Sequence, residues 1–421
     1  CVRGKNYWQK WFPADFICES FPGQFKNWFY SIIVMATILE GRPPTKTIFG
    51  YASVRDEKGE EMHKSKGNVL WFDEAAEKIG ADPMRWMYAR QNPVYDLKFG
   101  FNSAEKVKRK LFILYNVFSF FISYVEKKDI PASLKVNSKN VLDRWILSKL
   151  NNLISKVTSN LDKYRPSVAT LAIENFFIHD LSLWYLRRSR ERFHTNNRDR
   201  KGAIKTLYYV LITLTKIIAP IIPFFAEEMY QKIRTDNMPE SVHLCDWPEV
   251  DKKAIDKTLE EKMKIARDIV TQALAQRAKA RIKVRQPLVF LKIKNYKSEI
   301  GGERELIDLI KKEVNVKEII FDNKIKSKVE LDTKITEELK REGSDREQIR
   351  HVNLLRKKLR LTSKDIVAEI VSTFPVYNLK NFLKKTKAKN FRKVQKKDEM
   401  NVDIKKEIEL AKEKGYIGIK R

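Results

Sequence analysis

The spacing of hydrophobic residues near the beginning of the chain predicts strands that alternate with a helix. Residues 15–18 and 47–52 are short strand-like runs, and they flank an apolar run from residue 28 to residue 39. This apolar run ends at Gly41-Arg42-Pro43-Pro44, a sequence that cannot continue a helix. A helix between two strands is typical of a parallel α/β sheet, so we predict part of such a sheet within residues 12–72.

The pattern changes to long helices between residues 103 and 233. Apolar residues recur there at spacings of three and four, with a break at Arg165-Pro166, which predicts an antiparallel helical bundle. Beyond Trp247-Pro248, the pattern predicts a charged helix over 254–280, a strand over 288–293 and a second helix over 334–359. We therefore predict a third domain of mixed α+β structure.

The net charge of the chain indicates a polyanionic partner. The chain has 421 residues, 84 Lys and Arg against 54 Asp and Glu, and a formal net charge of +30, which favours nucleic acid. The basic residues are densest at 384–397, where eight of fourteen residues are basic and none is acidic. We expect this basic tail to be the segment nearest to disorder.

Cysteine and histidine content argues against a metal site. Three cysteines and five histidines are scattered along the chain, so neither a zinc site nor a disulfide framework is predicted, and a reducing, cytoplasmic compartment is expected. The longest apolar runs are interrupted by polar residues or prolines, which argues against a membrane span. The chain opens with Cys1 and lacks a signal peptide, so we expect it to be a piece of a longer protein.

A short segment after the turn at 57–59 contains side chains that could bind phosphate. The sequence His63-Lys64-Ser65-Lys66-Gly67-Asn68 combines two lysines, a hydroxyl, a glycine and an amide. Taken alone, this string is more typical of a solvated turn in a chain that is basic nearly everywhere.

Seven segments, taken in order, carry a family resemblance over nearly the whole chain. They are FPADFICES, WFYSI, GEEMHKSKGN, LDRWILSKLN, FFIHDLSLWYLRRSRERF, APIIPFFAEEMYQ and SVHLCDWPEV. The ordered set resembles the C-terminal portion of class I isoleucyl-tRNA synthetases. The resemblance implies the end of a Rossmann-like catalytic domain at 1–99, an all-α anticodon-binding domain at 100–250 and a small α+β domain at 251–421. It also implies isoleucine, ATP with Mg²⁺ and isoleucine tRNA as substrates.

In this family the KMSKS loop closes over the ATP phosphates, and Lys64 and Ser65 match the second half of that motif. Both are candidate catalytic residues, with Lys64 binding ATP. Amino-acid activation develops charge on phosphate oxygens, which a lysine on a mobile loop can stabilise. Glu61 and His63 replace the first lysine and first serine of the motif. A carboxylate therefore stands where the family has a cation.

The segment 19–28 resembles the family pattern E-G-x-D-Q-x-R-G-W. The resemblance implies that Glu19 holds the aminoacyl-adenylate and that Gln24 and Trp28 line the amino-acid pocket. The segment departs from the pattern by one extra residue and at Ser20, Gly23, Lys26 and Asn27. An equally weighted interpretation makes Trp28 the first core aromatic of a helix.

The candidate RNA-binding segment is 183–193. On a regular helix its arginines form two adjoining ridges beside an aromatic pair, an arrangement that suits single-stranded RNA. The alternative is a solvated helix face, with Asp180 and Glu191 pairing the arginines and the tryptophan in the core. The candidate residues are Trp184, Arg187, Arg188, Arg190 and Arg192. The basic segment Arg277–Arg285 is a second candidate.

Two features of the family are absent from the sequence: the H-x-G-H motif and the editing domain. We therefore expect the chain to need the missing N-terminal half of the synthetase as a partner, and to be inactive alone. Two alternatives remain open. One is a truncated, non-catalytic tRNA-binding protein, and the other is a valyl- or leucyl-type class I synthetase.

Overall fold

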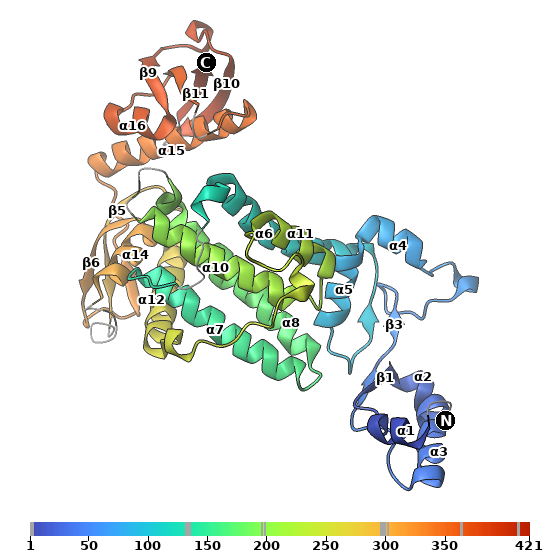
Figure 1. Cartoon of the computed structure of the whole chain (residues 1–421). Coiled ribbons are helices and arrows are strands. Elements are labelled where there is room, and N and C mark those ends of the chain that lie inside the picture. The colour runs from blue at the N-terminus through green and yellow to red at the C-terminus, as the bar shows by residue number, and fades with distance from the viewer. Residues whose placement is uncertain are drawn as a thin grey trace. The chain divides into compact units, whose positions relative to one another are not determined.

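The computed structural model describes residues 4–130, 136–194, 197, 199–294, 300, 303–362, 365–410 and 413–421. The chain divides into two compact units, Cys1–Lys257 and Thr258–Arg421 (Figure 1). The division into three domains at 99/100 and 250/251 remains a prediction.

The first unit begins with a two-stranded parallel sheet. Strand β1 pairs with β2, and Ile17 lies opposite Ile48. A helical crossover joins the two strands, as expected for parallel neighbours. Few residues of this part are buried: among residues 4–51, only Phe29, Ala36 and Thr45. The elements are α1 (Lys5–Trp11), β1 (Ile17–Ser20), α2 (Phe21–Gln24), the π-helical segment η1 (Phe25–Phe29), α3 (Tyr30–Glu40) and β2 (Ile48–Tyr51).

A second parallel pair, β3 (Val54–Arg55) and β4 (Leu97–Lys98), follows directly. The chain between the two strands contains the 3₁₀ turn η2 (Lys64–Lys66) and the helices α4 (Phe72–Ile79) and α5 (Ala81–Arg90). Strand β4 leads directly into the first long helix. Because β3 pairs with β4, the loop that follows β3 lies close to the start of that helix.

Long helices make up the rest of the first unit (Figure 1). Their apolar faces are turned inward, and Leu114, Ile146, Ile173 and Leu211 are fully buried. Pro166 and Pro223 each occupy the first turn of a helix, where the missing N–H costs nothing. The elements are α6 (Phe101–Tyr124), η3 (Lys127–Asp129), α7 (Val141–Leu161), α8 (Pro166–Asn175), the π-helical segment η4 (Phe176–Leu186), α9 (Arg187–Ser189), η5 (Arg190–Phe193), α10 (Arg200–Ile218), α11 (Pro223–Ile233), η6 (Val242–Leu244) and η7 (Lys252–Ala254).

A buried carboxylate fastens helix α5 to this bundle. The Glu174 side chain on α8 is 7% exposed and lies 2.6 Å from Lys110 Nζ and 3.1 Å from Arg90 Nε. It also accepts a hydrogen bond from Trp86 Nε1 at 3.2 Å. Because the charge of Glu174 is compensated on both sides, the contact joins α5, α6 and α8 without leaving an unpaired buried anion.

The described residues of the second unit form two sheets. In the first, β5 (Leu288–Ile293) lies between β6 (Val316–Phe321), parallel to it, and the antiparallel β7 (Val329–Leu331). The second has the order β10-β11-β8-β9. The other elements of this unit are α12 (Lys257–Lys279), α14 (Arg304–Val314), α15 (Glu337–Lys358), β8 (Val367–Ser372), α16 (Leu379–Thr386), β9 (Ala388–Lys393), η8 (Lys397–Glu399), β10 (Ile404–Leu410) and β11 (Glu413–Lys420).

The expectation that 384–397 is nearly disordered is wrong. This segment forms the end of α16, all of β9 and the start of η8. The fully buried Phe382 ring meets the Phe391 ring at a centroid distance of 5.5 Å, and Thr386 is buried beside them. A few apolar anchors on the inner face therefore order the segment, while its lysines occupy exposed positions.

Across the described ranges, no helix combines the length and the hydropathy that a membrane crossing requires.

Candidate nucleotide loop and nucleic-acid interface

The loop 56–68 is closed at its base by Asp56 and Asn68. Asp56 Oδ1 accepts the backbone N–H groups of Lys58 and Glu60 at 3.0 and 2.8 Å, which shapes the turn around Gly59. Asn68 Nδ2 donates to Asp56 Oδ2 at 3.0 Å, and Asn68 Oδ1 accepts the His63 N–H at 3.0 Å. The Asn68 hydrogen bond, followed by the backbone donors, lowers the pKa of Asp56 below its ordinary value.

Lys64 projects from this closed loop into solvent. It lies in the 3₁₀ turn η2, which Gly67 ends with a φ of 66°. Its ammonium lies 5.0 Å from the centroid of the Trp71 ring, a cation–π distance. In the part of the chain that the structure describes, neither Lys64 nor Lys66 forms an ion pair with a carboxylate. Both ammonium groups are therefore available to an anionic ligand.

Glu61, which stands at the first motif position, is engaged by other residues. Its Oε1 lies 3.4 Å from an Arg55 guanidinium nitrogen, and its Oε2 lies 3.3 Å from His63 Nε2. Arg55 also pairs with Asp96, next to β4. The carboxylate is thus held by Arg55 and His63 rather than by Lys64, and sequence reasoning had no signal for the Arg55 contact.

The three candidates for the adenylate and amino-acid pocket lie on neighbouring elements. Glu19 Oε1 on β1 accepts a hydrogen bond from the Tyr51 hydroxyl at 3.2 Å, and burial followed by this contact raises the pKa of Tyr51. Gln24 Oε1 accepts the backbone N–H of Trp28 at 3.3 Å. Trp28 is 41% exposed, so it does not occupy a core position.

The Trp28 ring lines an apolar hollow of about 380 Å³, whereas Glu19 and Gln24 do not. The structure therefore does not bring the three candidates into one cavity. The hollow is lined by Trp8, Trp11, Phe12, Ala14, Ile17, Trp28, Ile32, Met35, Ala36, Leu39, Glu40 and Pro44.

The candidate RNA-binding arginines do not form two ridges. The segment passes from the π-helical η4 through α9 to the 3₁₀ turn η5, so the spacing of a regular α-helix does not apply. Arg187 and Arg190 are exposed, and the Arg190 guanidinium lies 5.9 Å from the Phe120 ring centroid. Arg188 is half-buried against Trp184 at 5.0 Å, and burial followed by repulsion from Arg187 lowers the pKa of Arg188 to about 9.

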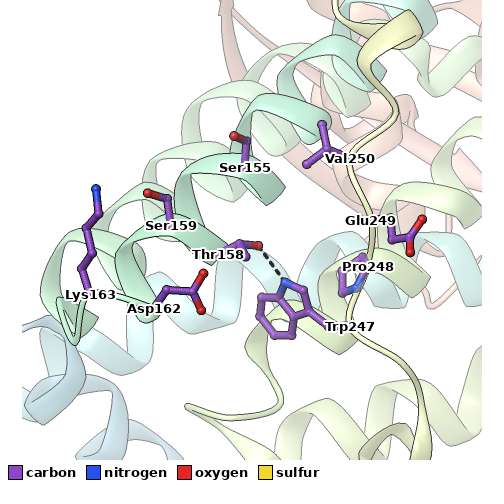
Figure 2. A pocket seen from close by; sticks show the side chains of 9 residues that line it. All are labelled: Ser155, Thr158, Ser159, Asp162, Lys163, Trp247, Pro248, Glu249 and Val250. Carbon is purple, nitrogen blue, oxygen red and sulfur yellow. Dashed lines mark hydrogen bonds between the residues drawn. The ribbon is translucent and has the colours of Figure 1, made fainter. Parts of the chain in front are cut away.

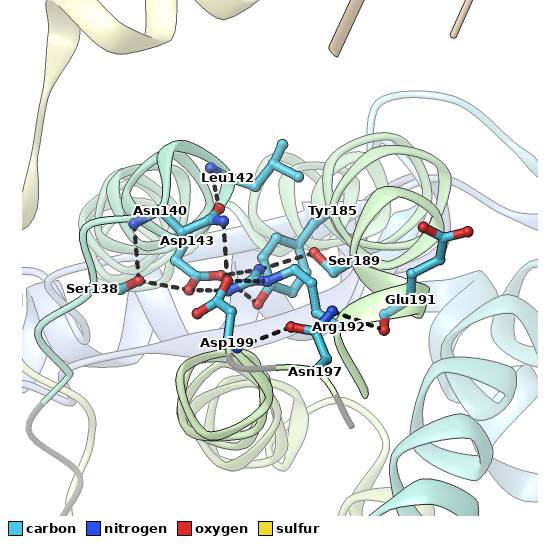
Figure 3. A network of polar contacts seen from close by, with 10 residues as sticks. All are labelled: Ser138, Asn140, Leu142, Asp143, Tyr185, Ser189, Glu191, Arg192, Asn197 and Asp199. Carbon is cyan, nitrogen blue, oxygen red and sulfur yellow. Dashed lines mark hydrogen bonds and ion pairs between the residues drawn. The ribbon is translucent and has the colours of Figure 1, made fainter. Parts of the chain in front are cut away.

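Arg192 lies inside the bundle, in a network of polar contacts (Figure 3). Two of its nitrogens donate to the two oxygens of the fully buried Asp143 at 2.7 and 2.6 Å, and its Nε donates to Asp199 at 2.7 Å. The buried Tyr185 hydroxyl donates to the same Asp143 at 2.8 Å. Burial by itself would lower the pKa of Arg192, but the contacts with Asp143, Tyr185 and Asp199 together outweigh burial and raise that pKa. Arg192 and Tyr185 therefore hold helices together, and their positions do not support RNA contact.

The second candidate segment begins with an arginine that is also internal. Arg277 is 1% exposed and donates to the carbonyl oxygens of Lys283, Gln286 and Asn315 at 3.1, 2.8 and 2.9 Å. Burial lowers the pKa of Arg277 to about 10. Its guanidinium organises the chain between α12 and β5 and is not presented to a partner.

A hollow that sequence reasoning missed lies along helix α7 (Figure 2). It measures about 470 Å³, and the Trp247 indole at its wall donates to Thr158 Oγ1 at 2.7 Å. Hydroxyl groups spaced along one face of α7 would have been the only sequence signal. The lining residues are Ser155, Thr158, Ser159, Asp162, Lys163, Trp247, Pro248, Glu249 and Val250.

Metal-ligating side chains do not gather in this structure: the described residues contain no group of three or more His, Cys, Asp or Glu that could hold a metal ion.

Comparisons with known families match two parts of the chain, and the second match extends into the second unit. The family of class I tRNA synthetases (I, L, M and V) matches residues 3–100. The anticodon-binding domain of tRNA ligase matches residues 143–294.

Similar whole proteins are isoleucine–tRNA ligases. One from Dehalococcoides mccartyi (strain CBDB1) is 36% identical over 380 residues, which cover 85% of this chain and 37% of that protein. One from Thermococcus kodakarensis is 38% identical over 327 residues, covering 76% of this chain and 30% of that protein. A solved LeuRS–tRNA–LeuAMS complex from Agrobacterium radiobacter K84 aligns at 18% identity over 58% of this chain and 29% of that chain, with a TM-score of 0.47.

The chain thus spans about a third of the length of the curated relatives it matches. Within that span, the match at residues 3–100 includes the loop 56–68, and the match at residues 143–294 runs from helix α7 to beyond helix α12. The chain therefore belongs to the class I tRNA synthetases, and its sequence is of the isoleucyl type.

Proposed function

We propose that the chain supplies the nucleotide loop and the tRNA-binding part of an enzyme that ligates isoleucine to its tRNA through an isoleucyl-adenylate, with ATP and Mg²⁺. The observation that carries this proposal is the environment of Lys64. Its ammonium is exposed on a loop closed by Asp56 and Asn68, and it is not neutralised by a carboxylate. A cation held in this way costs little reorganisation when negative charge develops on phosphate oxygens.

The other candidate residues take roles that fit their chemistry. The Ser65 hydroxyl adjoins Lys64 and serves as a further donor to a phosphate oxygen. Glu19 binds the ammonium or the ribose hydroxyls of the adenylate. These groups donate hydrogen bonds, and an ionised carboxylate accepts them. Gln24 fixes the backbone at Trp28, whose exposed ring forms an apolar wall for the isoleucine side chain. Such a wall discriminates only modestly between isoleucine and valine.

A partner polypeptide completes the catalytic fold in this proposal. Parallel sheets are normally covered on both faces, yet β1 and β2 form only a two-stranded sheet, and many apolar side chains around it are exposed. We propose that the N-terminal half of the synthetase, with its H-x-G-H motif, covers this surface. The exposed residues include Trp11, Phe25, Tyr30, Ile33, Met35, Ile38 and Leu39.

Lys64→Ala in protein reconstituted with that N-terminal half tests the proposal. Loss of the ammonium should slow isoleucine-dependent pyrophosphate exchange by more than about tenfold, or ~1.4 kcal/mol of transition-state stabilisation. The matched control is Lys58→Ala, which removes another exposed lysine from the same loop. An unchanged rate for Lys64→Ala, or an equal loss for both variants, contradicts the assignment.

The second candidate function is a non-catalytic tRNA-binding protein. The observation in its favour is Glu61, which pairs with Arg55 at the place where the family has a lysine. Under this alternative, the reconstituted protein binds tRNA but shows no isoleucine-dependent exchange, and Glu61→Lys does not restore it. Exchange by the wild-type complex excludes this alternative.

A further inference from the structure

Glu57 makes a contact that neither the motif nor the proposed chemistry explains. It stands at the start of the nucleotide loop, next to Asp56, and its side chain reaches the first turn of helix α6. Its Oε1 accepts the backbone N–H of Ser103 at 2.6 Å, and its Oε2 accepts a hydrogen bond from Asn102 Nδ2 at 2.8 Å. The carboxylate thus bridges the loop and the bundle across more than forty residues of chain.

This contact does the work of a helix N-cap. The N-cap residue of α6 is Gly100, which has no side chain to bind the N–H groups of the first turn, and that turn contains no acidic residue. Ser103 is the third helical residue, whose N–H an N-cap side chain usually satisfies. Glu57 therefore supplies both the missing acceptor and the negative charge that the N-terminal end of a helix favours.

Burial raises the pKa of the Glu57 carboxyl, but the hydrogen bonds from Ser103 and Asn102 outweigh that effect, so the pKa lies below its ordinary value. The carboxylate form that the cap requires is therefore favoured by its own donors. Gly100 is part of the same arrangement, because a Cβ on Gly100 would overlap Cγ and Cδ of Glu57. Any larger residue at position 100 must displace the Glu57 side chain.

The far end of α6 lies beside the candidate RNA-binding arginines. The Arg190 guanidinium faces the Phe120 ring at 5.9 Å, and Arg200 donates to the backbone carbonyl of Tyr124 at 3.1 Å. One helix of 24 residues therefore contacts the nucleotide loop at its first turn and the arginine segment at its last turns.

We infer that Glu57 is a positioning residue: its contact with α6 fixes the loop that carries Lys64, and so seats the nucleotide-binding lysine on the first helix of the bundle. This inference rests on the proposed function, since it assigns Glu57 a part in delivering Lys64 to the ATP phosphates. The Asp56–Asn68 contact closes the loop upon itself, whereas Glu57 attaches the closed loop to the bundle.

The first experiment measures hydrogen exchange on the full chain. Glu57→Ala should accelerate exchange of the amides in residues 61–67 about fivefold or more, while α7 amides keep their wild-type rates. Gly100→Ala should reproduce this result by displacing Glu57 sterically. Glu57→Gln, which retains an acceptor for the Ser103 N–H, should restore part of the protection. The matched control is Glu60→Ala, an exposed glutamate of the same loop. Loop exchange in Glu57→Ala equal to that in the control overturns the inference.

The second experiment measures pyrophosphate exchange after reconstitution. Glu57→Ala should lower kcat at least about threefold with the KM for isoleucine unchanged, because the lysine is misplaced and the amino-acid pocket is not. If Glu57→Ala leaves kcat unchanged while Lys64→Ala abolishes exchange, the positioning role is overturned and the proposed function stands. If Lys64→Ala has no effect, the proposed function falls, and the positioning role falls with it.

Discussion

The arginines of the segment 187–192 lie close together in the sequence but differ in their structural roles. The role of each depends on the side chains that it contacts. Arg190 is exposed beside a ring, whereas Arg192 gives its donors to two carboxylates. The sequence could predict a cationic segment but not this division, because Asp143 lies 49 residues away from Arg192. Lys64 was easier to predict, since the spacing of its motif is local. Whether it acts on ATP remains a proposal.

Asp143→Ala is expected to destabilise the first unit by about 3–5 kcal/mol, because it leaves the Arg192 guanidinium buried without its main partner. Urea denaturation followed by circular dichroism measures the change. The neighbouring Arg144→Ala is the matched control: it breaks an exposed pair with Asp256 and should cost at most about 1 kcal/mol. Similar losses in the two variants would contradict a special role for the buried pair.

The longer helices and the strands β1, β2 and β5 could be predicted from periodicity, whereas the remaining strands of the second unit were not. The helix expected over 334–359 is α15 (Glu337–Lys358), and the strand expected over 288–293 is β5 (Leu288–Ile293). Two features escaped sequence reasoning for physical reasons. The order of 384–397 depends on the packing of Phe382 and Phe391, which charge density conceals. The π-helical turns at η1 and η4 have no periodicity signal of their own.

Asp345 on helix α15 anchors the segment that leads into helix α16, whose own N-cap is Asn378. The buried Asp345 accepts the N–H groups of Tyr377 and Asn378, the latter at 2.7 Å, where α16 begins. Asp345→Ala should therefore lower the free energy of unfolding of the second unit by about 2 kcal/mol. Thermal or urea unfolding measures this change. Glu337→Ala, at an exposed position on α15, serves as the control. A loss no larger than that of the control would show that the start of α16 does not rely on the Asp345 contact.

At the scale of the whole molecule, the excess of basic residues leads most directly to one prediction, a polyanionic partner. The net charge of +30 favours any polyanion, so charge alone cannot distinguish tRNA from other nucleic acids. The amino-acid pocket could not be assembled from the sequence, because the segment 19–28 departs from the family pattern. In the structure, Trp28 lines a hollow that Glu19 and Gln24 do not reach.

Specific tRNA binding by the full chain is expected to depend on the exposed arginines. Replacing Arg187 and Arg190 together by alanine should weaken binding of isoleucine tRNA and reduce the slope of log K against log salt by about two, one for each lost phosphate contact. Filter binding across a salt series measures both quantities. Arg109→Ala, which removes an exposed arginine from a different helix, α6, is the control. Equal affinity for a tRNA with another anticodon at every salt concentration would reduce the interaction to nonspecific attraction.

Helix α6 makes contacts at both of its ends. These contacts restrict the number of residues in the helix more than they restrict which residues it contains. Its 24 residues span about 36 Å, and each residue advances the helix by about 1.5 Å and turns it by about 100°. A substitution at an exposed position such as Phe112 leaves the distance and the angular phase of the two ends unchanged. Insertion of one residue would rotate Phe120 by more than a quarter turn relative to Glu57. Natural variation between Gly100 and Tyr124 should therefore exchange side chains freely on the outer face while preserving the number of residues.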